Sequence, residues 1–498
     1  MTPLATEESK PPASTDNIAA IAGRGTIYIT AAKIWFMLSG YGIAVTLTYL
    51  LTIENYGIYR VVINTVSIIN AVIVTGTYQT VSKYVSQEPE NAGSIKWKAL
   101  GLQMYVGGAA TLGFFLLAPL VASLLNDPRL TGYLRLASLI TLSYSFYSVY
   151  TGYFNGKKRF GIQAGLDMTY STLKLVFIVS LAWLGFGVTG SVGGFAIAAA
   201  SVLVLSAIVA RGSGRRGEAR AADLFKFQSY VLLFTFVLTL LQRVDLMLIK
   251  ALSSADATTA SENAGYYSAA VDIANLTYQI VVSVTFVVFP LVSQSTFADD
   301  RARTQGYISN TLRYTLMVMA LTATLFSSCA GGVLRVIYRE AYQAGGSALR
   351  IVAFGMLFFG LLYVITTIIS ASGQPRVSLL VGVITLILST ALNAALIPSY
   401  GLAGAATATT VSMLAGTILA CAYLWRRFRT LMSMASVVRI AVCAGAIYAA
   451  SLLFSPASKG LIVAQLIALS VVYLIALIVS GELGRDDLKL IARMVRAT

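Results

Sequence analysis

Residues 54–59 read Glu-Asn-Tyr-Gly-Ile-Tyr, and residues 262–267 read Glu-Asn-Ala-Gly-Tyr-Tyr, at a spacing of 208 residues. Each stretch leads into a long apolar run. Further along, Gly187-Val188-Thr189-Gly190 is matched by Gly401-Leu402-Ala403-Gly404 at a spacing of 214 residues. Because the matches keep the same order, the sequence predicts that the chain contains two related halves.

The composition is that of a membrane protein. Of 498 residues, 57% are hydrophobic and only 11% are charged, and the mean hydropathy is +0.77. A soluble domain carries about 25% charged residues. An outer-membrane barrel would show short alternating segments instead of long apolar runs. The chain has no His, which excludes chemistry that needs imidazole as a base or a metal ligand.

Fourteen apolar runs are long enough to cross a bilayer, which takes a helix of about 20 residues. They are residues 26–51, 60–81, 99–125, 131–154, 167–187, 189–210, 227–251, 266–293, 309–338, 345–371, 378–397, 402–425, 437–455 and 460–480. The repeat pairs each span with the sixth span after it. Since an even shift preserves orientation, we expect two parallel six-helix halves and two added helices.

The predicted fold class is therefore an all-α polytopic membrane protein with fourteen transmembrane helices. Its expected parts are a disordered cytoplasmic N-terminus at 1–25, an N-lobe at 26–210, a basic cytoplasmic linker at 211–226, a C-lobe at 227–425, the last two spans within 426–480, and a cytoplasmic amphipathic tail at 481–498.

The distribution of Lys and Arg predicts the orientation. With the N-terminus in the cytoplasm, 23 of the 36 basic residues fall in cytoplasmic segments and three fall in outer loops. Positively charged loops stay on the cytoplasmic side. We therefore expect a multi-pass protein of the cytoplasmic membrane with both termini inside, and the net charge of +16 reflects this topology and not a nucleic-acid partner.

The order of these motifs resembles a known family. The motifs are residues 53–59, Gly265-Tyr266-Tyr267-Ser268-Ala269-Ala270, Phe289-Pro290-Leu291-Val292-Ser293, and Tyr400-Gly401-Leu402-Ala403-Gly404-Ala405-Ala406. Over about residues 20–480 the chain is similar to the polysaccharide (Wzx-type) branch of the multidrug/oligosaccharidyl-lipid/polysaccharide exporter superfamily. The resemblance implies a lipid-linked oligosaccharide flippase with two six-helix lobes around a central cavity that alternates access.

Basic residues inside or at the rim of the spans are the candidate substrate-binding groups, because an ionisable side chain in a membrane is costly unless it is paired or faces water. They are Lys33, Arg60, Lys174, Arg243 and Lys250. Asp167, at the cytoplasmic edge of a span, is the only acid in the first six spans. A cavity with unpaired cations favours an anionic substrate such as a pyrophosphate. For Lys33 and Lys174 a structural ion pair remains the alternative.

Asp245 and Asp272 are the candidate ion-coupling residues. Asp245 belongs to Arg243-Val244-Asp245, which is similar to an aspartate-bearing position common in that branch. Arg243 and Lys250 are seven residues apart and would share one helical face, so either aspartate could simply pair with these cations. Alternatively, one of them titrates and couples transport to H⁺ or Na⁺, because without His the carboxylates are the remaining proton carriers.

The sequence shows no enzyme signature. The Gly152–Lys158 stretch is too short for a P-loop, and no Ser or Thr follows Lys157. We expect no catalytic residue, no metal site and no cofactor other than a coupling ion. The expected partners are a lipid-linked oligosaccharide, membrane lipids, and the glycosyltransferases or polymerase of the same pathway. The alternatives are a lipid II flippase, a cation-coupled drug antiporter and, from another class, a membrane polymerase or glycosyltransferase.

Overall fold

The structure is a computed structural model that describes residues 15–211, 235–454, 456 and 458–484. Within these residues the chain is helical and contains no strand. The helices are α1 (Thr15–Leu50), α2 (Ile53–Gln87), α3 (Ala92–Leu124), α4 (Leu130–Gly156), α5 (Phe160–Leu181), α6 (Gly187–Val209), α8 (Val244–Leu252), α9 (Ala257–Phe297), α10 (Arg301–Ser328), α11 (Ala330–Ile337), α12 (Gly346–Ala371), α13 (Pro375–Phe428), α14 (Met434–Leu452) and α15 (Lys459–Val479).

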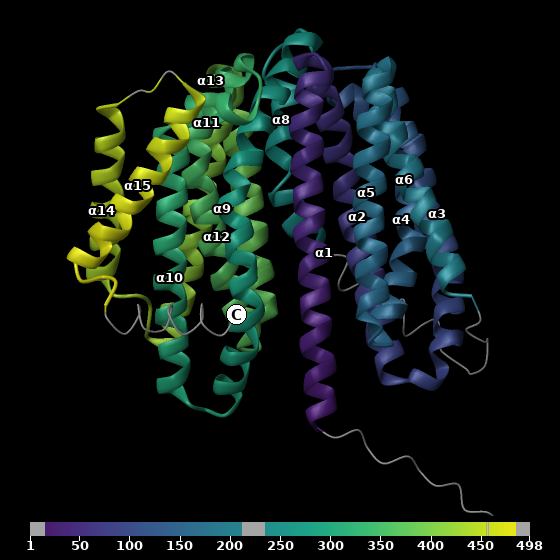
Figure 1. The fold of residues 1–498 in the computed structure, drawn as a ribbon, viewed down its shortest axis with the longest axis horizontal. Coiled ribbons are helices and arrows are strands. Elements are labelled where there is room, and N and C mark those ends of the chain that lie inside the picture. Colours follow the sequence, from purple (N-terminus) through teal and green to yellow (C-terminus); the bar gives the residue numbers. More distant parts are fainter. Residues whose placement is uncertain (1–14, 212–234, 455, 457, 485–498) are drawn as a thin grey trace, which may run out of the picture.

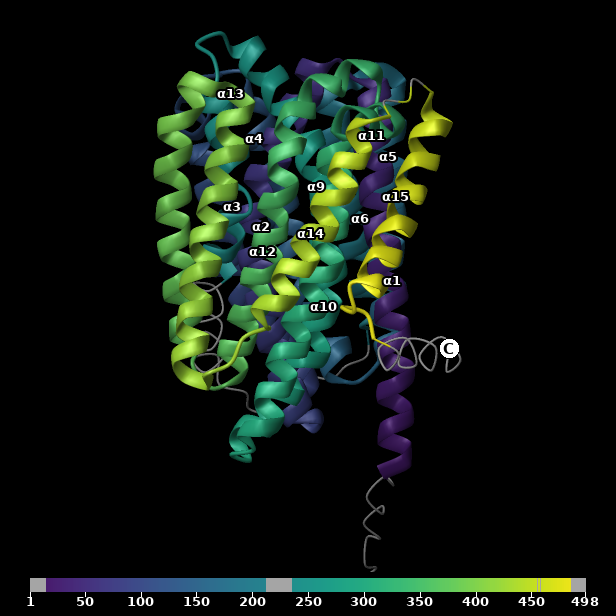
Figure 2. The same cartoon turned by 90° about the vertical axis from the view of Figure 1, so that its left-hand side faces the viewer.

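The helices form two groups (Figure 1). Helices α1–α6 pack on one another and make the first group, and helices α8–α13 make the second. The main contact between the groups is made by α2 and α9, and α8 also touches α2. Helices α14 and α15 lie against α10 and α11 of the second group (Figure 2).

The two ends of the bundle differ in how they join the groups. We call the end that holds residues 51–53, 126–129 and 253–256 the junction end; it lies at the top of Figure 1. The opposite end holds residues 157–159 and 298–300. The hydrogen bonds and ion pairs between the groups that are described below belong to the junction half of the bundle.

The repeat predicted from the glycine motifs is visible in the backbone. Gly187 has φ 54° and ψ −133°, and Gly401 has φ 54° and ψ −128°, so both have a positive φ and the same backbone conformation. Such a backbone favours glycine. Three residues after each turn, a Cβ at Gly190 or Gly404 would lie 2.9 Å or 2.4 Å from a carbonyl oxygen of the preceding helical segment. Both halves thus contain the same tight helical hairpin.

The apolar helices are those of a multi-pass membrane protein. By length and composition, eight helices of the described residues can cross a membrane, or nine if α10 and α11, bent by 85°, form one span. Two of the eight, Phe160–Val209 and Pro375–Phe428, are the continuous segments that contain the glycine hairpins. The expected count of fourteen crossings stays a prediction.

Two sequence predictions require correction. Helix α1 begins at Thr15, so residues 15–25 are helical and not disordered; the run Ala19-Ala20-Ile21-Ala22 supplies strong helix formers. The expected span 227–251 is interrupted, because residues 242 and 243 form a turn before α8. The amide of Arg243 there bonds to the carbonyl of Leu240 at 3.0 Å. Residues 485–498 of the expected tail and 212–226 of the expected linker lie outside the described residues.

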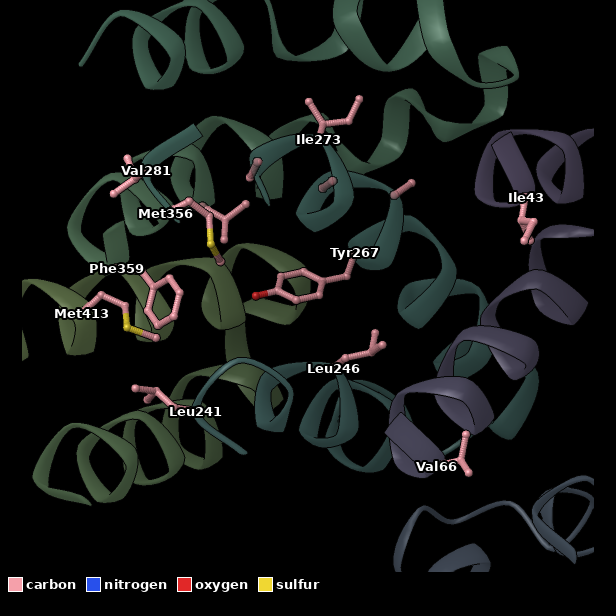
Figure 3. Close-up of a cluster of buried hydrophobic side chains, with 14 of the residues drawn as sticks. Ile43, Val66, Leu241, Leu246, Tyr267, Ile273, Val281, Met356, Phe359 and Met413 are labelled. Carbon is pink, nitrogen blue, oxygen red and sulfur yellow. The ribbon is translucent and has the colours of Figure 1, made fainter. Parts of the chain in front are cut away.

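The second group has a continuous apolar core. Leu246 of α8, Tyr267 of α9, Met356 and Phe359 of α12, and Met413 of α13 converge there (Figure 3). Burial of these side chains holds the short helix α8 against α9 and α13. The polar residues at the ends of α8 are thereby fixed next to the first group.

Candidate functional site

Two repeat-equivalent glycines allow α2 and α9 to cross at the junction end. A Cβ at Gly57 would lie 1.7 Å from the carbonyl oxygen of Ser261 and 3.0 Å from the nitrogen of Gly265. A Cβ at Gly265 would lie 2.9 Å from the carbonyl oxygen of Ile53 and 3.4 Å from the nitrogen of Gly57. Only residues without a side chain let the two backbones approach this closely, so the groups are in direct backbone contact here.

A closed ion-pair network lies beside this crossing. The Lys250 ammonium is fully buried and donates to Asp127 Oδ2 at 2.8 Å, the Ala257 carbonyl at 2.9 Å and Ser261 Oγ at 2.6 Å. These acceptors use all three of its donors. Arg129 bridges Asp127, at 2.9 Å, to Glu54, at 2.8 Å. Lys250 therefore joins α8 to the loop between α3 and α4.

Asp127 is the anion on which this network depends. Burial alone would raise its pKa, but the hydrogen bonds from Arg129 and Lys250 outweigh burial and hold the pKa of Asp127 below its ordinary value. The carboxylate is thus charged at neutral pH, and it holds the first group to the second through Lys250.

Arg60 and Asp272 form a second ion pair between the groups. The guanidinium of Arg60 on α2 donates to Asp272 Oδ1 on α9 at 2.6 Å, and both side chains are mostly buried. Tyr41 of α1 donates to the backbone carbonyl of Asp272 at 3.1 Å. The other carboxylate oxygen, Oδ2, is buried and has no hydrogen-bond partner among the described residues. Asp272 therefore retains unused capacity to accept a proton or a cation.

Arg243 lies at the helix break and also faces the first group. Its backbone carbonyl accepts from Asn64 Nδ2 at 2.9 Å, and its guanidinium donates to Asn64 Oδ1 at 3.3 Å. Asn64 and Asp272 are 208 residues apart, so they are equivalent in the repeat. Asn64 of the first half bonds to Arg243 of the second half, and the equivalent Asp272 of the second half pairs with Arg60 of the first half.

Lys174 of α5 brings a third cation to the same region. Its ammonium lies 4.5 Å from the ring centre of Phe195 and 5.5 Å from that of Phe36, which are cation–π distances. Its strongest charged neighbours are Arg60 and Arg243. We call Arg60, Lys174 and Arg243 the cation cluster. Asp272 is the one acid paired with it among the described residues, so the arrangement carries excess positive charge.

Lys33 and Asp167 lie nearer the opposite end. Asp167 of α5 is the charged neighbour of Lys33 on α1, and it accepts a hydrogen bond from Tyr147 at 2.6 Å. The sequence places Asp167 at the cytoplasmic edge of a span. In the structure Asp167 is the acid that acts electrostatically on Lys33, and whether Lys33 forms a structural ion pair or lines a cavity stays open.

Asp245 is turned into the second group. It is 4% exposed and accepts from the hydroxyl of Tyr267 at 2.8 Å and from the amide of Leu246 at 2.8 Å. Tyr267 extends among α8, α9 and α12 (Figure 3). Asp245 therefore pairs with neither Arg243 nor Lys250 in the part of the chain that the structure describes.

Of the residues singled out from the sequence, the structure brings together Arg60, Lys174, Arg243 and Asp272. It separates from them Lys33, Lys250 and Asp245. The expectation that Asp272 or Asp245 pairs with Arg243 or Lys250 is wrong: Asp272 pairs with Arg60, and Lys250 pairs with Asp127. The break before α8 removes the common helical face on which that expectation rested.

Sequence reasoning missed Asn64 and Asp127, and it noted Asp167 without giving it a role. Asp127 belongs to Asn126-Asp127-Pro128, which has the composition of an ordinary turn between two spans. For Asn64 the available signal was the repeat, since the same spacing that aligns Gly57 with Gly265 aligns it with Asp272. For Asp167 the signal was its spacing of seven residues from Lys174, which places both on one face of a helix.

The chain is 24% identical over 160 residues to the probable low-salt glycan biosynthesis flippase Agl15 of Haloferax volcanii. The aligned part spans 32% of this chain and 34% of that relative, so the chain covers only about a third of it.

Solved structures show the same fold. The lipid II flippase MurJ in an inward closed conformation matches with a TM-score of 0.77 and 15% identity, over 92% of this chain and 100% of that one. An inward-facing multidrug resistance MATE family transporter of the MOP superfamily matches with a TM-score of 0.65 and 13% identity, over 80% of this chain and 94% of that one. At such identities the likeness establishes the fold alone.

The sequence match to a protein family identifies the family of this chain. The model for polysaccharide biosynthesis proteins matches residues 46–345, which is more than half of the chain and includes Arg60, Lys174, Arg243 and Asp272. The chain therefore belongs to the polysaccharide biosynthesis protein family.

Proposed function

We propose that this protein is a flippase that moves a polyprenyl-pyrophosphate-linked oligosaccharide across the cytoplasmic membrane by alternating access, for the synthesis of a cell-surface polysaccharide. The observation that carries the proposal is the cation cluster. Arg60, Lys174 and Arg243 come from α2, α5 and the break before α8, yet they are electrostatic neighbours in a membrane protein. Such a concentration of positive charge requires an anion to offset it.

The pyrophosphate is the group that fits the cluster. A guanidinium presents a planar fork of donors that binds phosphate oxygens in pairs, and an ammonium adds a point charge. In the absence of ligand, Asp272 occupies Arg60 at 2.6 Å. A pyrophosphate would displace Asp272 from Arg60, so binding is coupled to the contact between the two groups.

The contacts that close the junction end bear on the side of the membrane from which the cation cluster is reached. The glycine crossing, the Lys250–Asp127 pair and the Arg60–Asp272 pair join the groups at that end. The Lys and Arg distribution assigns that end to the outside. With that end outside, these contacts must open before the substrate is released there.

The remaining candidates take other roles in this proposal. Lys250 holds the junction end and does not bind substrate, because its three donors are occupied by protein. Asp245 stabilises the second group. The mechanism is transport and not catalysis, and a coupling ion, H⁺ or Na⁺, supplies the driving force.

A lipid II flippase is the second candidate. It is favoured by the match of MurJ over 92% of this chain. Both substrates carry the same polyprenyl pyrophosphate, so the cation cluster serves either one. A cation-coupled drug antiporter is less well supported, because the excess positive charge of the cluster repels cationic drugs.

Binding of undecaprenyl pyrophosphate to the purified protein tests the proposal. Arg60→Gln and Lys174→Gln should each weaken binding about tenfold, which corresponds to about 1.4 kcal/mol. Arg301→Gln, which changes an exposed arginine of the opposite end, should leave affinity unchanged. Asp272→Asn should strengthen binding, because the competing carboxylate loses its charge. Equal affinities for all four variants would contradict the proposal, as would a lack of binding by the unaltered protein.

A further inference from the structure

A chain of hydrogen bonds leads from the opposite end of the bundle into the first group. Ser82 Oγ donates to Asn155 Oδ1 at 2.7 Å, and Asn155 Nδ2 donates to Gln163 Oε1 at 2.9 Å. Gln163 in turn bonds to the side chain of Asp167, one helical turn further along α5. Asn155 lies two residues from Lys157 in the loop at that end. The chain therefore links the end loop to a carboxylate.

Asp167 lies inside the helical bundle. It is seven residues from the start of α5, which is about 10 Å along the axis at 1.5 Å per residue. The buried hydroxyl of Tyr147 donates to Oδ1 at 2.6 Å. A carboxylate at this depth is expensive unless its charge is offset or it is protonated.

The groups that face Asp167 come from each packed neighbour. They are Lys33 from α1, Tyr144 and Tyr147 from α4, Tyr78 from α2, and Gln163 from α5 itself. Helix α6 contributes Phe195, which belongs to the adjoining ring cluster. Lys33 is the one cation in this set. Its position therefore decides whether the negative charge of Asp167 is offset.

The seam between α1 and α5 connects Asp167 with the cation cluster. Lys174 is seven residues after Asp167 and so lies on the same face of α5, about two turns nearer the junction end. Phe36, three residues after Lys33 on α1, packs against the ammonium of Lys174. Trp35 Nε1 donates to Thr172 Oγ1 at 3.0 Å within the same seam. An anion at the cluster is thus within two helical turns of Lys33.

We propose that Asp167 is the coupling carboxylate of the flippase and that it takes up one proton from the cytoplasm when a pyrophosphate binds and draws Lys33 away. This inference rests on the proposed function. The pyrophosphate replaces Asp167 as the anion nearest Lys33, and the unpaired carboxylate becomes a carboxylic acid that still bonds to Tyr147. The only bond formed is the O–H bond of the acid, and the proton comes from water on the cytoplasmic side. Gln163, Asn155 and Ser82 position the carboxylate through hydrogen bonds, because amide side chains do not pass protons on.

The coupling is reciprocal by thermodynamic necessity. If binding takes up a proton, a lower pH favours binding. Asp272 pairs with Arg60 in the junction half, where the two groups are in contact, and Asp245 is enclosed in the second group, so among the described residues neither lies on a hydrogen-bond chain that reaches the opposite end. Asp167, in contrast, is connected to the cytoplasmic end.

Calorimetric titration with undecaprenyl pyrophosphate, repeated in two buffers of different ionisation enthalpy, counts the protons taken up per bound ligand. The unaltered protein should take up about one proton. Asp167→Asn should bind the ligand and take up none, whereas Asp167→Glu should restore the uptake. Asp299→Asn, a change of an exposed carboxylate, should behave as the unaltered protein.

The outcomes separate the two proposals. If the unaltered protein does not bind the ligand, the proposed function fails. If it binds and Asp167→Asn takes up the same number of protons, the coupling role of Asp167 fails while the proposed function stands. If Asp167→Asn does not fold, Tyr147→Phe is the test. Loss of the Tyr147 hydroxyl should favour the protonated form of Asp167 before the ligand binds, so fewer protons should be taken up on binding. An unchanged number of protons would overturn the inference.

Discussion

Gly57 and Gly265, which occupy equivalent positions in the two halves of the chain, pack against each other at the junction end, where a Cβ at Gly265 would lie 3.4 Å from the nitrogen of Gly57. The equivalent glycines of the two halves are thus in contact with each other. Because neither residue has a side chain, α2 and α9 approach at backbone distance and bring Arg60 to Asp272.

Gly57→Ala should open the junction end. Its Cβ would lie 1.7 Å from the Ser261 carbonyl oxygen, and overpacking of this kind costs about 1–3 kcal/mol. Opening is reported by the substitution Ala260→Cys, because residue 260 is only 1% exposed. The three native cysteines are replaced in this variant. Labelling of the introduced cysteine by an impermeant maleimide should be at least about tenfold faster in Gly57→Ala. Gly101→Ala on α3, where a Cβ meets nothing within 4 Å, should not change the labelling rate.

Asp127→Asn should destabilise the protein more than Lys250→Met combined with Asp127→Asn. The single change leaves the buried Lys250 ammonium without its anion, which costs about 3–5 kcal/mol when a buried pair loses one partner. The double change removes both charges and should recover most of that loss. Thermal unfolding in detergent measures the stability of both variants. A double variant that is no more stable than the single variant would show that the Lys250–Asp127 ion pair does not account for the loss.

The lowered pKa of Asp127 predicts acid sensitivity of the junction end. A carboxyl group whose pKa is lower in the folded protein contributes stability above its ordinary pKa, and that stability is lost as the pH falls through the folded value. The loss should therefore begin below about pH 4. The thermal unfolding midpoint in detergent should fall below that pH in the unaltered protein, and it should fall less in the Asp127→Asn, Lys250→Met double variant.

The repeat and its hairpins were predictable from the sequence, because glycine conformations are local. Gly187 and Gly401 share one backbone geometry, and the surrounding motif shows it. Arg60, Lys174 and Arg243 could be singled out because charge inside an apolar run is conspicuous.

The partners of the charged residues were not predictable. Asp127 lies 123 residues before Lys250, and its own neighbourhood reads as an ordinary turn. The break at Arg243 also escaped detection, because no Gly or Pro marks residues 242 and 243. Tertiary contacts determine both features, and local sequence carries no record of them.

Glu482 should hold the C-terminal helices to the second group. Its carboxylate is 1% exposed, accepts from Arg313 Nε of α10 at 2.8 Å, and lies 3.6 Å from Arg439 of α14. Glu482→Gln leaves a neutral acceptor and should weaken this attachment by about 1–3 kcal/mol. Limited proteolysis in the loop between α13 and α14 should then be faster, whereas Glu340→Gln, at an exposed carboxylate, should match the unaltered protein.

Transport of a lipid-linked oligosaccharide by the purified protein measures directly whether the cation cluster moves a pyrophosphate across the membrane. The purified protein is reconstituted into vesicles with a fluorescent polyprenyl-pyrophosphate-linked oligosaccharide, and the fraction of label that an impermeant quencher reaches is followed over time. Flipping should depend on the protein, fall at least about tenfold in Arg60→Gln and Lys174→Gln, and be unchanged in Arg301→Gln. Flipping at the unaltered rate in both cluster variants, or none by the unaltered protein under an imposed proton or sodium gradient, would contradict it.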